Sequence, residues 1–479
     1  MGLALGVIIL FGPVNPRQEV TFTSKWVTQG AIRPGEVEKK NARTAEIEKP
    51  LFEGPLSYKT YKFETIVVGS PETYSGGFVH APGHHLNAVA ALSLDGEKRP
   101  LIWLRSSDLQ ASRLSRGEPY ALPSVVAGLR ETQGESGDLS LVAGLFESTG
   151  LKIVDGSARA LGADITPTMP LESTECESYF LGVVHTFTPV RGSGATVIPL
   201  SVKEAWDLFE SGKVSDAGRA QALYGRALDS IGYLRSHDVY ATDFPALKER
   251  FDTLGMGEVW DLRATQEGQA PPKLSGRVRP TREARESAVV IHERKISLDH
   301  GEMVESRLRG ADSPSGRVAG ASSEIEAVFL KLPHDRLKVA EYYLDEGAGP
   351  MVRLFTQVRA PLEFAPGKPR VLRRDVMDGP IERDLEFPGT LENTVELGRP
   401  TSASASLSDL YYRFGATEME TPAKPKGEGY VTLAEALREC RSGQGDAQTE
   451  ALLLRLADHL RWNPNLGMSW ESIDRAMQR

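Results

Sequence analysis

Three glutamates occupy one short segment of the chain, within the sequence LESTECESYF. Glu172, Glu175 and Glu177 are separated there only by Ser, Thr and Cys. A carboxylate can act as a general base when it lies within hydrogen-bond reach of the proton that it removes. Such a base has little to act on without a metal site, so the pattern favours a solvated acidic loop over a catalytic one.

Histidines form a second group of potential ligands, in the segment FVHAPGHHLNAV. His80, His84 and His85, with Glu72 upstream, are the densest group of histidines in the chain. A metal site needs at least three protein ligands that converge, and proximity in sequence does not supply that convergence. A turn between strands, with hydrogen-bonded histidines, is the favoured interpretation.

Strands, turns and helices must position these groups. The sequence of residues 56–110 predicts strands separated by turns. Within it, the apolar runs AVAALSL and PLIWLR predict the two strands of a hairpin. A loop at Gly128 precedes a predicted helix over 138–147, and Gly150 occupies the position of a C′ glycine. A strand, SYFLGVVH, and an amphipathic helical region, VKEAWDLFESGKVSDAGRAQALYGRAL, follow.

The second half repeats this order. Residues 264–281 are rich in Pro, Gly and polar residues and form the best linker candidate. Strands resume after it, and the chain closes with two helical segments. The spacing of paired residues in these segments matches that of the first half. The matched pairs are Glu204-Ala205 with Glu435-Ala436, Ser211-Gly212 with Ser442-Gly443, Asp216-Ala217 with Asp446-Ala447, and Ala222-Leu223 with Ala451-Leu452.

The elements before the closing helices also recur. In each half a loop ending in Glu (Glu135, Glu396) precedes a short predicted helix ending in Gly (Gly150, Gly415). We interpret the chain as two copies of one domain, the second lacking about 30 residues that include the SYFLGVVH strand.

The repeat divides the chain into five parts. These are an N-terminal extension (1–55), a first domain (56–230), a helical extension and linker (231–283), a shortened second domain (284–460) and a C-terminal tail (461–479).

The loop–helix–loop at 128–151 resembles the Nudix box, G-x5-E-x7-R-E-U-x-E-E-x-G-U, where U is apolar. Its surroundings are similar to the ADP-ribose pyrophosphatase branch of the Nudix superfamily, which typically carries a PAGL…GE loop before the box. That loop here is Ala127-Gly128-Leu129 followed by Gly134-Glu135, and Ser173-Thr174-Glu175 matches the loop that carries the catalytic base in many members.

The resemblance implies an α/β (α+β) fold: tandem Nudix-like α/β/α sandwich domains with mixed sheets. It covers residues 85–230 of the first half and, through the repeat, 285–460 of the second. Active relatives in this branch form intertwined homodimers, so the two copies are expected to form a pseudo-dimer within one chain.

The chemistry that the family needs is missing from the first box. Nudix hydrolysis uses hard divalent cations held by glutamates one helical turn apart. Aligned on Gly150, the box has Ala143 and Gly144 in place of Arg-Glu and Ser148 in place of a ligand Glu; Glu147 is the one acid retained.

A second degenerate box is expected over 389–416. Aligned on Gly415, it has Ser408 and Asp409 at the Arg-Glu pair and Tyr412 and Arg413 at the Glu-Glu pair. Arg413 would place a positive charge at a ligand position and repel a cation there. We therefore expect no catalytic residues, no metal and no cofactor.

Residual chemistry remains as two alternatives. By the resemblance, Arg105 lies where relatives place an Arg near the diphosphate, and Arg105, Glu135 and Glu175 are the candidates for residual nucleotide binding. One alternative is a divergent hydrolase of ADP-ribose-like compounds that uses Glu135, Glu147, Glu175 or Asp409. The other is a sensor that binds such nucleotides without cleaving them.

Composition narrows the class of protein. With 40% hydrophobic and 25% charged residues, the chain of 479 residues has the composition of a globular protein. Its net charge of −9 argues against nucleic acid as a partner. The two cysteines, Cys176 and Cys440, exclude a disulfide framework and fit a reducing compartment.

The N-terminus carries the run LALGVIILF over residues 3–11, which would span about half of a bilayer core as a helix. A buried strand or docking segment is the favoured interpretation. A peripheral membrane contact through residues 3–14 and the remnant of a processed targeting sequence are the alternatives.

These features predict a Nudix pseudoenzyme that serves as a structural subunit of a protein complex. The charge of −9 disfavours a ribosome, so the expected host is a respiratory-chain or ATP-synthase complex. The expected localisation is soluble or membrane-peripheral, in a mitochondrion.

Overall fold

The computed structural model describes the chain in segments separated by gaps. The described residues are 44–45, 57–67, 70–80, 85–95, 99–108, 116, 122–129, 149–153, 158–162, 165–187, 197–238, 288–298, 301–310, 324–359, 361–362, 365, 372–383, 394–403, 408–421 and 429–478. We call 57–238 the N-terminal half and 288–478 the C-terminal half. The apolar run 3–14, the linker 264–281 and most of the first box lie outside the described residues.

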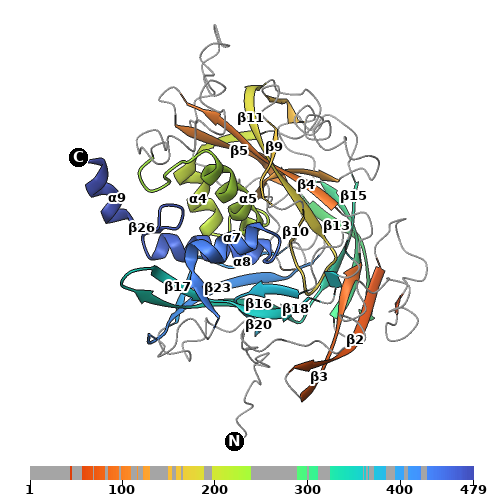
Figure 1. Ribbon diagram of the computed structural model, residues 1–479. Helices are drawn as coiled ribbons and strands as arrows, with labels where there is room; N and C mark the ends of the chain where they lie inside the picture. The colour runs from red at the N-terminus through yellow and green to blue at the C-terminus, as the bar shows by residue number, and fades with distance from the viewer. Residues whose placement is uncertain are drawn as a thin grey trace, which may run out of the picture.

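A mixed sheet forms the centre of the N-terminal half (Figure 1). Its strand order is β10-β11-β4-β5-β12, with β11 parallel to β4 and the other pairs of this path antiparallel. The short strands β6, β7, β8 and β9 pair at its margins. The strands are β4 (His85–Leu94), β5 (Pro100–Asp108), β6 (Leu122–Ser124), β7 (Val126–Leu129), β8 (Leu151–Ile153), β9 (Arg159–Ala160), β10 (Thr166–Pro167), β11 (Cys176–Phe187) and β12 (Val197–Ser201).

The C-terminal half contains a sheet of the same plan, in the order β21-β23-β16-β17-β24. Here β23 is parallel to β16, as β11 is to β4, and β17 is antiparallel to β16, as β5 is to β4. The strands are β16 (His334–Asp345), β17 (Gly349–Arg353), β20 (Met377–Glu382), β21 (Thr394–Glu396), β22 (Thr401–Ser402), β23 (Tyr411–Glu418) and β24 (Tyr430–Thr432).

Smaller sheets accompany the two central ones. Long hairpins precede each central sheet. In the N-terminal half, Val79 of β3 forms an isolated bridge with Ser173; in the C-terminal half, Leu330 of β15 forms the matching bridge with Ser408. The strands are β1 (Thr44–Ala45), β2 (Ser57–Val67), β3 (Ser70–His80), β13 (Ala288–Leu298), β14 (Gly301–Gly310), β15 (Glu324–Lys331), β18 (Phe355–Val358), β19 (Leu372–Asp375), β25 (Trp462–Asn463) and β26 (Met468–Ser469).

Two helices follow the last strand of each central sheet. They are α4 (Val202–Glu210) and α5 (Ala217–Ser230) in the N-terminal half, and α7 (Leu433–Arg441) and α8 (Ala447–His459) in the C-terminal half. Helices α4 and α7 begin with the same capping box, Ser201 with Glu204 and Thr432 with Glu435. The predicted closing helices and their spacing are therefore confirmed.

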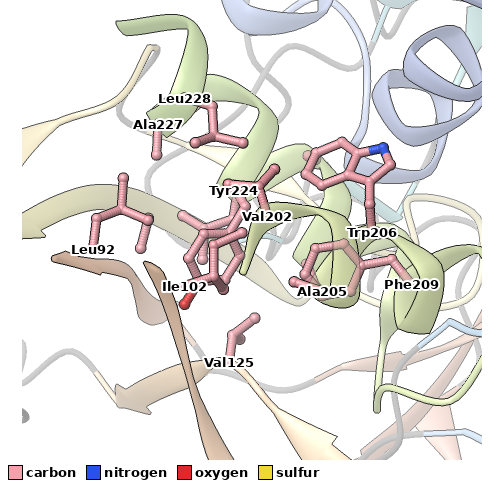
Figure 2. Close-up of a cluster of buried hydrophobic side chains, with 14 of the residues drawn as sticks. Leu92, Ile102, Val125, Val202, Ala205, Trp206, Phe209, Tyr224, Ala227 and Leu228 are labelled. Atoms are coloured by element: carbon pink, nitrogen blue, oxygen red, sulfur yellow. The ribbon is translucent and has the colours of Figure 1, made fainter. Parts of the chain in front are cut away.

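Apolar side chains from α4 and α5 cover one face of the N-terminal sheet. Trp206, Phe209 and Tyr224 belong to one buried cluster with the strand residues Leu92 and Ile102 (Figure 2). Strand residues alternate between this cluster and a second one on the opposite face of the sheet. Helices α7 and α8 supply the equivalent core of the C-terminal half.

The two halves meet through α5 and α8, with reciprocal contacts. Arg226 of α5 donates to Glu450 of α8 and to the carbonyl of Leu161, and its guanidinium lies 4.8 Å from the ring centroid of Tyr179. Arg455 of α8 donates to Gln221 of α5 and to the carbonyl of Leu397, and lies 4.8 Å from the ring centroid of Phe414. Such an exchange of matching contacts is the pattern of an isologous interface.

The C-terminal tail returns to the N-terminal half. After the β25–β26 hairpin, α9 (Trp470–Met477) buries Trp470 and Ile473 in the core of the N-terminal half. The imidazole of His237 lies 3.0 Å from a carboxylate oxygen of Asp474. The tail thus joins the two halves.

The prediction of a short helix that ends at Gly415 is wrong. Residues 411–418 form β23, which pairs in parallel with β16. Tyr412 and Arg413 lie in this strand, and Ser408 and Asp409 lie in the loop before it. Within YYRFGATE, the buried Tyr412, Phe414 and Ala416 recur at every second residue, which fits one face of a strand better than a helix.

The second half therefore has a counterpart of the SYFLGVVH strand, contrary to expectation. What is shorter is the connection that the first half uses for its box. The chain has 21 residues between β7 and β8 (130–150) and 11 between β20 and β21 (383–393). The broad fold prediction is confirmed: the protein is mixed α/β with several sheets and few helices in its described part.

Candidate functional site

The acidic segment 172–177 is buried, so the prediction that it forms a solvated loop is wrong. Glu172 is 6% exposed, and Glu175 and Glu177 are 0% exposed. Glu177 lies in β11, in register with Leu86 of the central strand β4. The segment enters the middle of a sheet, and this position removes its side chains from solvent.

Glu175 and Glu177 have partners within the N-terminal half. The Thr168 hydroxyl donates to Glu175 at 2.8 Å, and the Glu175 backbone N–H donates to the Ser173 hydroxyl. An oxygen of Glu177 lies 2.8 Å from the guanidinium of Arg219. Burial raises the pKa of Glu177 to about 8, although Arg219 acts to lower it.

Glu172 reaches across to the C-terminal half. Its carboxylate lies 3.4 Å from Nε of Arg336, which is 3.1 Å from Asp378. Burial raises the pKa of Glu172, and the charge of Arg336 opposes that rise. This acid therefore belongs to the contact between the halves.

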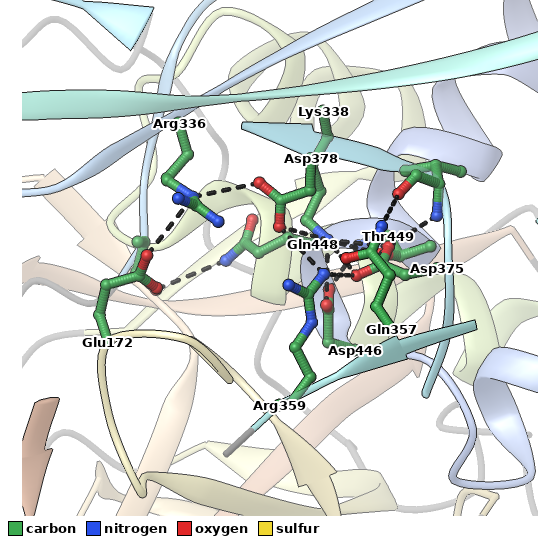
Figure 3. Close-up of polar contacts among 12 residues, drawn as sticks. Glu172, Arg336, Lys338, Gln357, Arg359, Asp375, Asp378, Asp446, Gln448 and Thr449 are labelled. Carbon is green, nitrogen blue, oxygen red and sulfur yellow. Dashed lines mark hydrogen bonds and ion pairs between the residues drawn. The ribbon is translucent and has the colours of Figure 1, made fainter. Parts of the chain in front are cut away.

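A buried ion cluster continues from this contact into the C-terminal half (Figure 3). Lys338, which is 0% exposed, donates to Asp375 at 2.9 and 3.0 Å, to Asp446 at 3.0 Å and to Thr449 at 2.8 Å. Arg359 donates to Asp375 as well. Every cation of the cluster thus contacts carboxylates, as buried charges require.

Opposing effects set the charge states in this cluster. Burial acts to raise the pKa of Asp375, but Lys338 and Arg359 outweigh it and hold that pKa below its usual range. Burial acts to lower the pKa of Lys338, but the carboxylates of Asp375 and Asp446 raise it above its usual range. Lys338 and Asp375 therefore stay charged at neutral pH.

The residues expected at the second box have structural partners. Both oxygens of Asp409 accept from Arg383 at 2.8 Å, and one accepts from the backbone N–H of Leu332 at 3.0 Å. Arg413 forms an ion pair with Glu396 at 3.2 Å. Because its carboxylate is held in this way, Asp409 is poorly placed to bind a cation.

The two remaining residues of the expected second box, Ser408 and Tyr412, are both buried in the fold. The Ser408 hydroxyl donates to the sulfur of Met169 at 3.4 Å and accepts from the backbone N–H of Leu410. Tyr412 is buried, and its hydroxyl has no hydrogen-bond partner among the described residues.

The candidates for residual nucleotide binding are only partly described. Arg105 lies in β5, in register with Val197 and Ser124, and its buried Nε has no hydrogen-bond partner in the described part of the chain. Glu135 lies outside the described residues, as do Ala143, Gly144, Glu147 and Ser148. Gly150 has φ +80°, as predicted for a C′ glycine.

The side chains of the histidine group, His80, His84 and His85, lie outside the described part of the chain. Within the described part, no group of three or more His, Cys, Asp or Glu side chains is arranged to hold a metal ion. Among the same residues, no helix is both long and apolar enough to cross a membrane.

Sequence reasoning missed the ion cluster around Lys338. One signal was available: the strand RLKVAEYYL carries Arg336 and Lys338 on the same face as Ala340 and Tyr342. Two cations on an otherwise apolar face indicate buried carboxylate partners.

No protein-family model matches the chain, and no curated protein gives a significant match to it.

Proposed function

We propose that this protein is a catalytically inactive, Nudix-like pseudo-dimer that serves as a structural or interaction subunit of a larger assembly. The observation that carries the proposal is the state of its candidate acids. Glu175 and Asp409, which a divergent hydrolase would use, are buried and bound by side chains of the fold. A cation would have to displace Arg383 before it could reach Asp409.

The shorter second half supports the loss of activity. Its 11-residue connection, 383–393, is about half as long as the segment that resembles the Nudix box in the first half. A complete loop–helix–loop of about 23 residues cannot be accommodated in that length.

The reciprocal contacts of α5 and α8 support the pseudo-dimer. Arg226 and Arg455 have matching partners in the two halves, as expected when two subunits that meet around a twofold axis are fused into one chain. A fused pseudo-dimer with buried acids is suited to holding a shape rather than to turning over a substrate.

We further propose a host of the energy-transducing membrane class, with the chain at its periphery. The net charge of −9 supports a protein partner over nucleic acid. Isolation of the native protein under mild conditions, with mass spectrometry of the accompanying proteins, tests the subunit role. A stable complex containing several membrane-complex subunits is expected; a monomer of 52.3 kDa without partners would contradict it.

A non-cleaving nucleotide sensor is the second candidate, and one observation favours it. The buried Nε of Arg105 has no hydrogen-bond partner among the residues that the structure describes, and an unsatisfied buried donor is costly unless a ligand binds it. At hundredfold excess over its Kd, ADP-ribose should then stabilise the chain by about 2.7 kcal/mol. An unchanged melting temperature with ADP-ribose at millimolar concentration would remove this candidate.

A further inference from the structure

Helices α5 and α8 meet at a position that is equivalent in the two halves. The reciprocal contacts of Arg226 and Arg455 make these two arginines equivalent, and Gly225 and Leu454 directly precede them. These two preceding residues also meet each other, because a Cβ atom at position 225 would lie 2.6 Å from Cδ1 of Leu454. A position that meets its own equivalent lies on the pseudo-twofold axis between the halves.

Unlike residues fill this axis. Leu454 is 0% exposed, and its side chain occupies the space that Gly225 leaves open. Two N-terminal halves paired in the same way would place glycine against glycine and leave a buried gap, which is destabilising. Two C-terminal halves would place two leucines where one leucine leaves no room for a methyl group. The axis is therefore well packed only between unlike halves.

Charges beside the axis also differ between the halves. Asp229 and Asp458 each follow their equivalent arginine by three residues, and Glu210 and Arg441 are the last residues of α4 and α7. Arg441 donates to Asp229 at 2.6 Å. In the mirror contact, burial raises the pKa of Glu210, and the charge of Asp458 adds to that rise. Two N-terminal halves would bring Glu210 towards Asp229 twice, so like charges disfavour that pair.

We infer that the α5–α8 interface is selective for unlike halves, so that neither half pairs with its own copy in a second chain. The protein then enters an assembly as a single copy whose α5 and α8 faces already cover each other. This selectivity rests on the proposed pseudo-dimer, but not on the loss of hydrolysis or on the nature of the host.

Refolding of the cut chain tests the selectivity. The full chain, with a protease site introduced into the predicted linker 264–281, is cut in its folded state, unfolded in urea and refolded by dilution. Native mass spectrometry then counts the pairs of halves. Random pairing would give as many like pairs as unlike pairs. We expect unlike pairs to exceed like pairs at least ~10-fold, because an overpacked axis costs ~1–3 kcal/mol.

Two variants of α8 show whether the axis residue sets this ratio. Leu454→Ala makes room for a second C-terminal half and should raise the share of like pairs at least ~3-fold. Leu456→Ala is the matched control, since Leu456 is equally buried but lies about 200° further around the helix. It should keep the wild-type ratio.

The results separate the selectivity from the pseudo-dimer. Equal amounts of like and unlike pairs in the wild type, or the same ratio in Leu454→Ala as in Leu456→Ala, would overturn the selectivity alone. Halves that refold without pairing would contradict the pseudo-dimer itself.

Thermal melts of the uncut chain give a second measurement that needs no refolding. Gly225→Ala should lower the melting temperature by at least ~2 °C in the wild-type background and should not lower it in the Leu454→Ala background, because residues in contact are not additive. An equal fall in both backgrounds would show that Gly225 and Leu454 do not fill the axis together, and would overturn the selectivity.

Discussion

Arg226 of α5 donates a hydrogen bond from Nε to a carboxylate oxygen of Glu450 in α8, at 2.7 Å, and both side chains are buried. The equivalent arginine of the other half, Arg455, donates from Nε to Gln221 at the same distance. One half thus uses a carboxylate where the other uses an amide. This difference makes the two contacts unequal in free energy although their geometry matches.

Removal of the Arg226 side chain should therefore destabilise the folded protein strongly. Arg226→Met leaves Glu450 buried with Arg441 as its remaining cationic partner among the described residues, and removing one member of a buried pair costs about 3–5 kcal/mol. We expect the free energy of unfolding to fall by that amount in a denaturant titration.

The exposed pair Lys203–Asp207 provides the control, because Lys203→Met should change stability by less than about 1 kcal/mol. If the two substitutions lowered the free energy of unfolding equally, the Arg226–Glu450 contact between α5 and α8 would not be a main source of stability at the interface.

Glycine at position 225 permits the close approach of α5 to α8. A Cβ atom there would lie 2.6 Å from Cδ1 of Leu454. In an ordinary exposed helix, Gly→Ala stabilises by up to about 1 kcal/mol. Here we expect Gly225→Ala to destabilise by about 1–3 kcal/mol, because the core is overpacked.

Gly379→Ala is the matched control, since a Cβ atom at position 379 would meet no described atom within 4 Å. It should be neutral or slightly stabilising in the same thermal melt. A stabilised Gly225→Ala variant would contradict the close packing of the two helices.

Stability should depend on pH through Glu177, whose pKa burial raises to about 8. The folded chain then binds more protons than the unfolded chain, in which the pKa of Glu is about 4.3. The contribution of Glu177 to the free energy of unfolding should therefore fall as pH rises from about 5 to 8. Glu177→Gln should reduce this fall by at least about 1 kcal/mol.

Urea titrations at pH 5, 6, 7 and 8 measure this effect. The exposed Glu346 is the control position, and Glu346→Gln should keep the wild-type slope. A Glu177→Gln slope identical to that of the wild type would mean that Glu177 is ionised throughout, as a strong pair with Arg219 would require.

The two capping boxes should contribute equally. Ser201→Ala and Thr432→Ala each remove a hydroxyl that accepts from the backbone N–H three residues on. Each should cost about 1 kcal/mol, with the pair additive because the caps lie in different helices. Differential scanning calorimetry of the single and double variants measures this, and a cost at only one site would argue against equivalent roles.

The closing helices were the part of the fold most accessible from sequence. Glu204 and Glu435 each follow a Ser or Thr by three residues, and Ser211-Gly212 and Ser442-Gly443 end the helices. Such signals act within one or two turns of chain, so a single sequence contains them completely.

The pairing of strands was not accessible in the same way. Gly415 has the same local surroundings as a helix-ending glycine, but parallel pairing of β23 with β16, about 75 residues earlier, makes it a strand residue. The burial of Glu172 likewise depends on Arg336, more than 160 residues away. A contact at that separation leaves no pattern within the acidic segment itself, which has the local sequence of a solvated loop; the available signal lay in the strand that carries Arg336.

The central claim is that the chain does not hydrolyse nucleoside diphosphates. The most direct measurement is the release of AMP from ADP-ribose by the purified full-length protein with Mg²⁺ or Mn²⁺ at neutral pH. We predict no turnover above the rate of the buffer with metal alone. Metal-dependent turnover near 1 per second, which is typical of working enzymes, and its loss in Glu175→Gln, would contradict the claim.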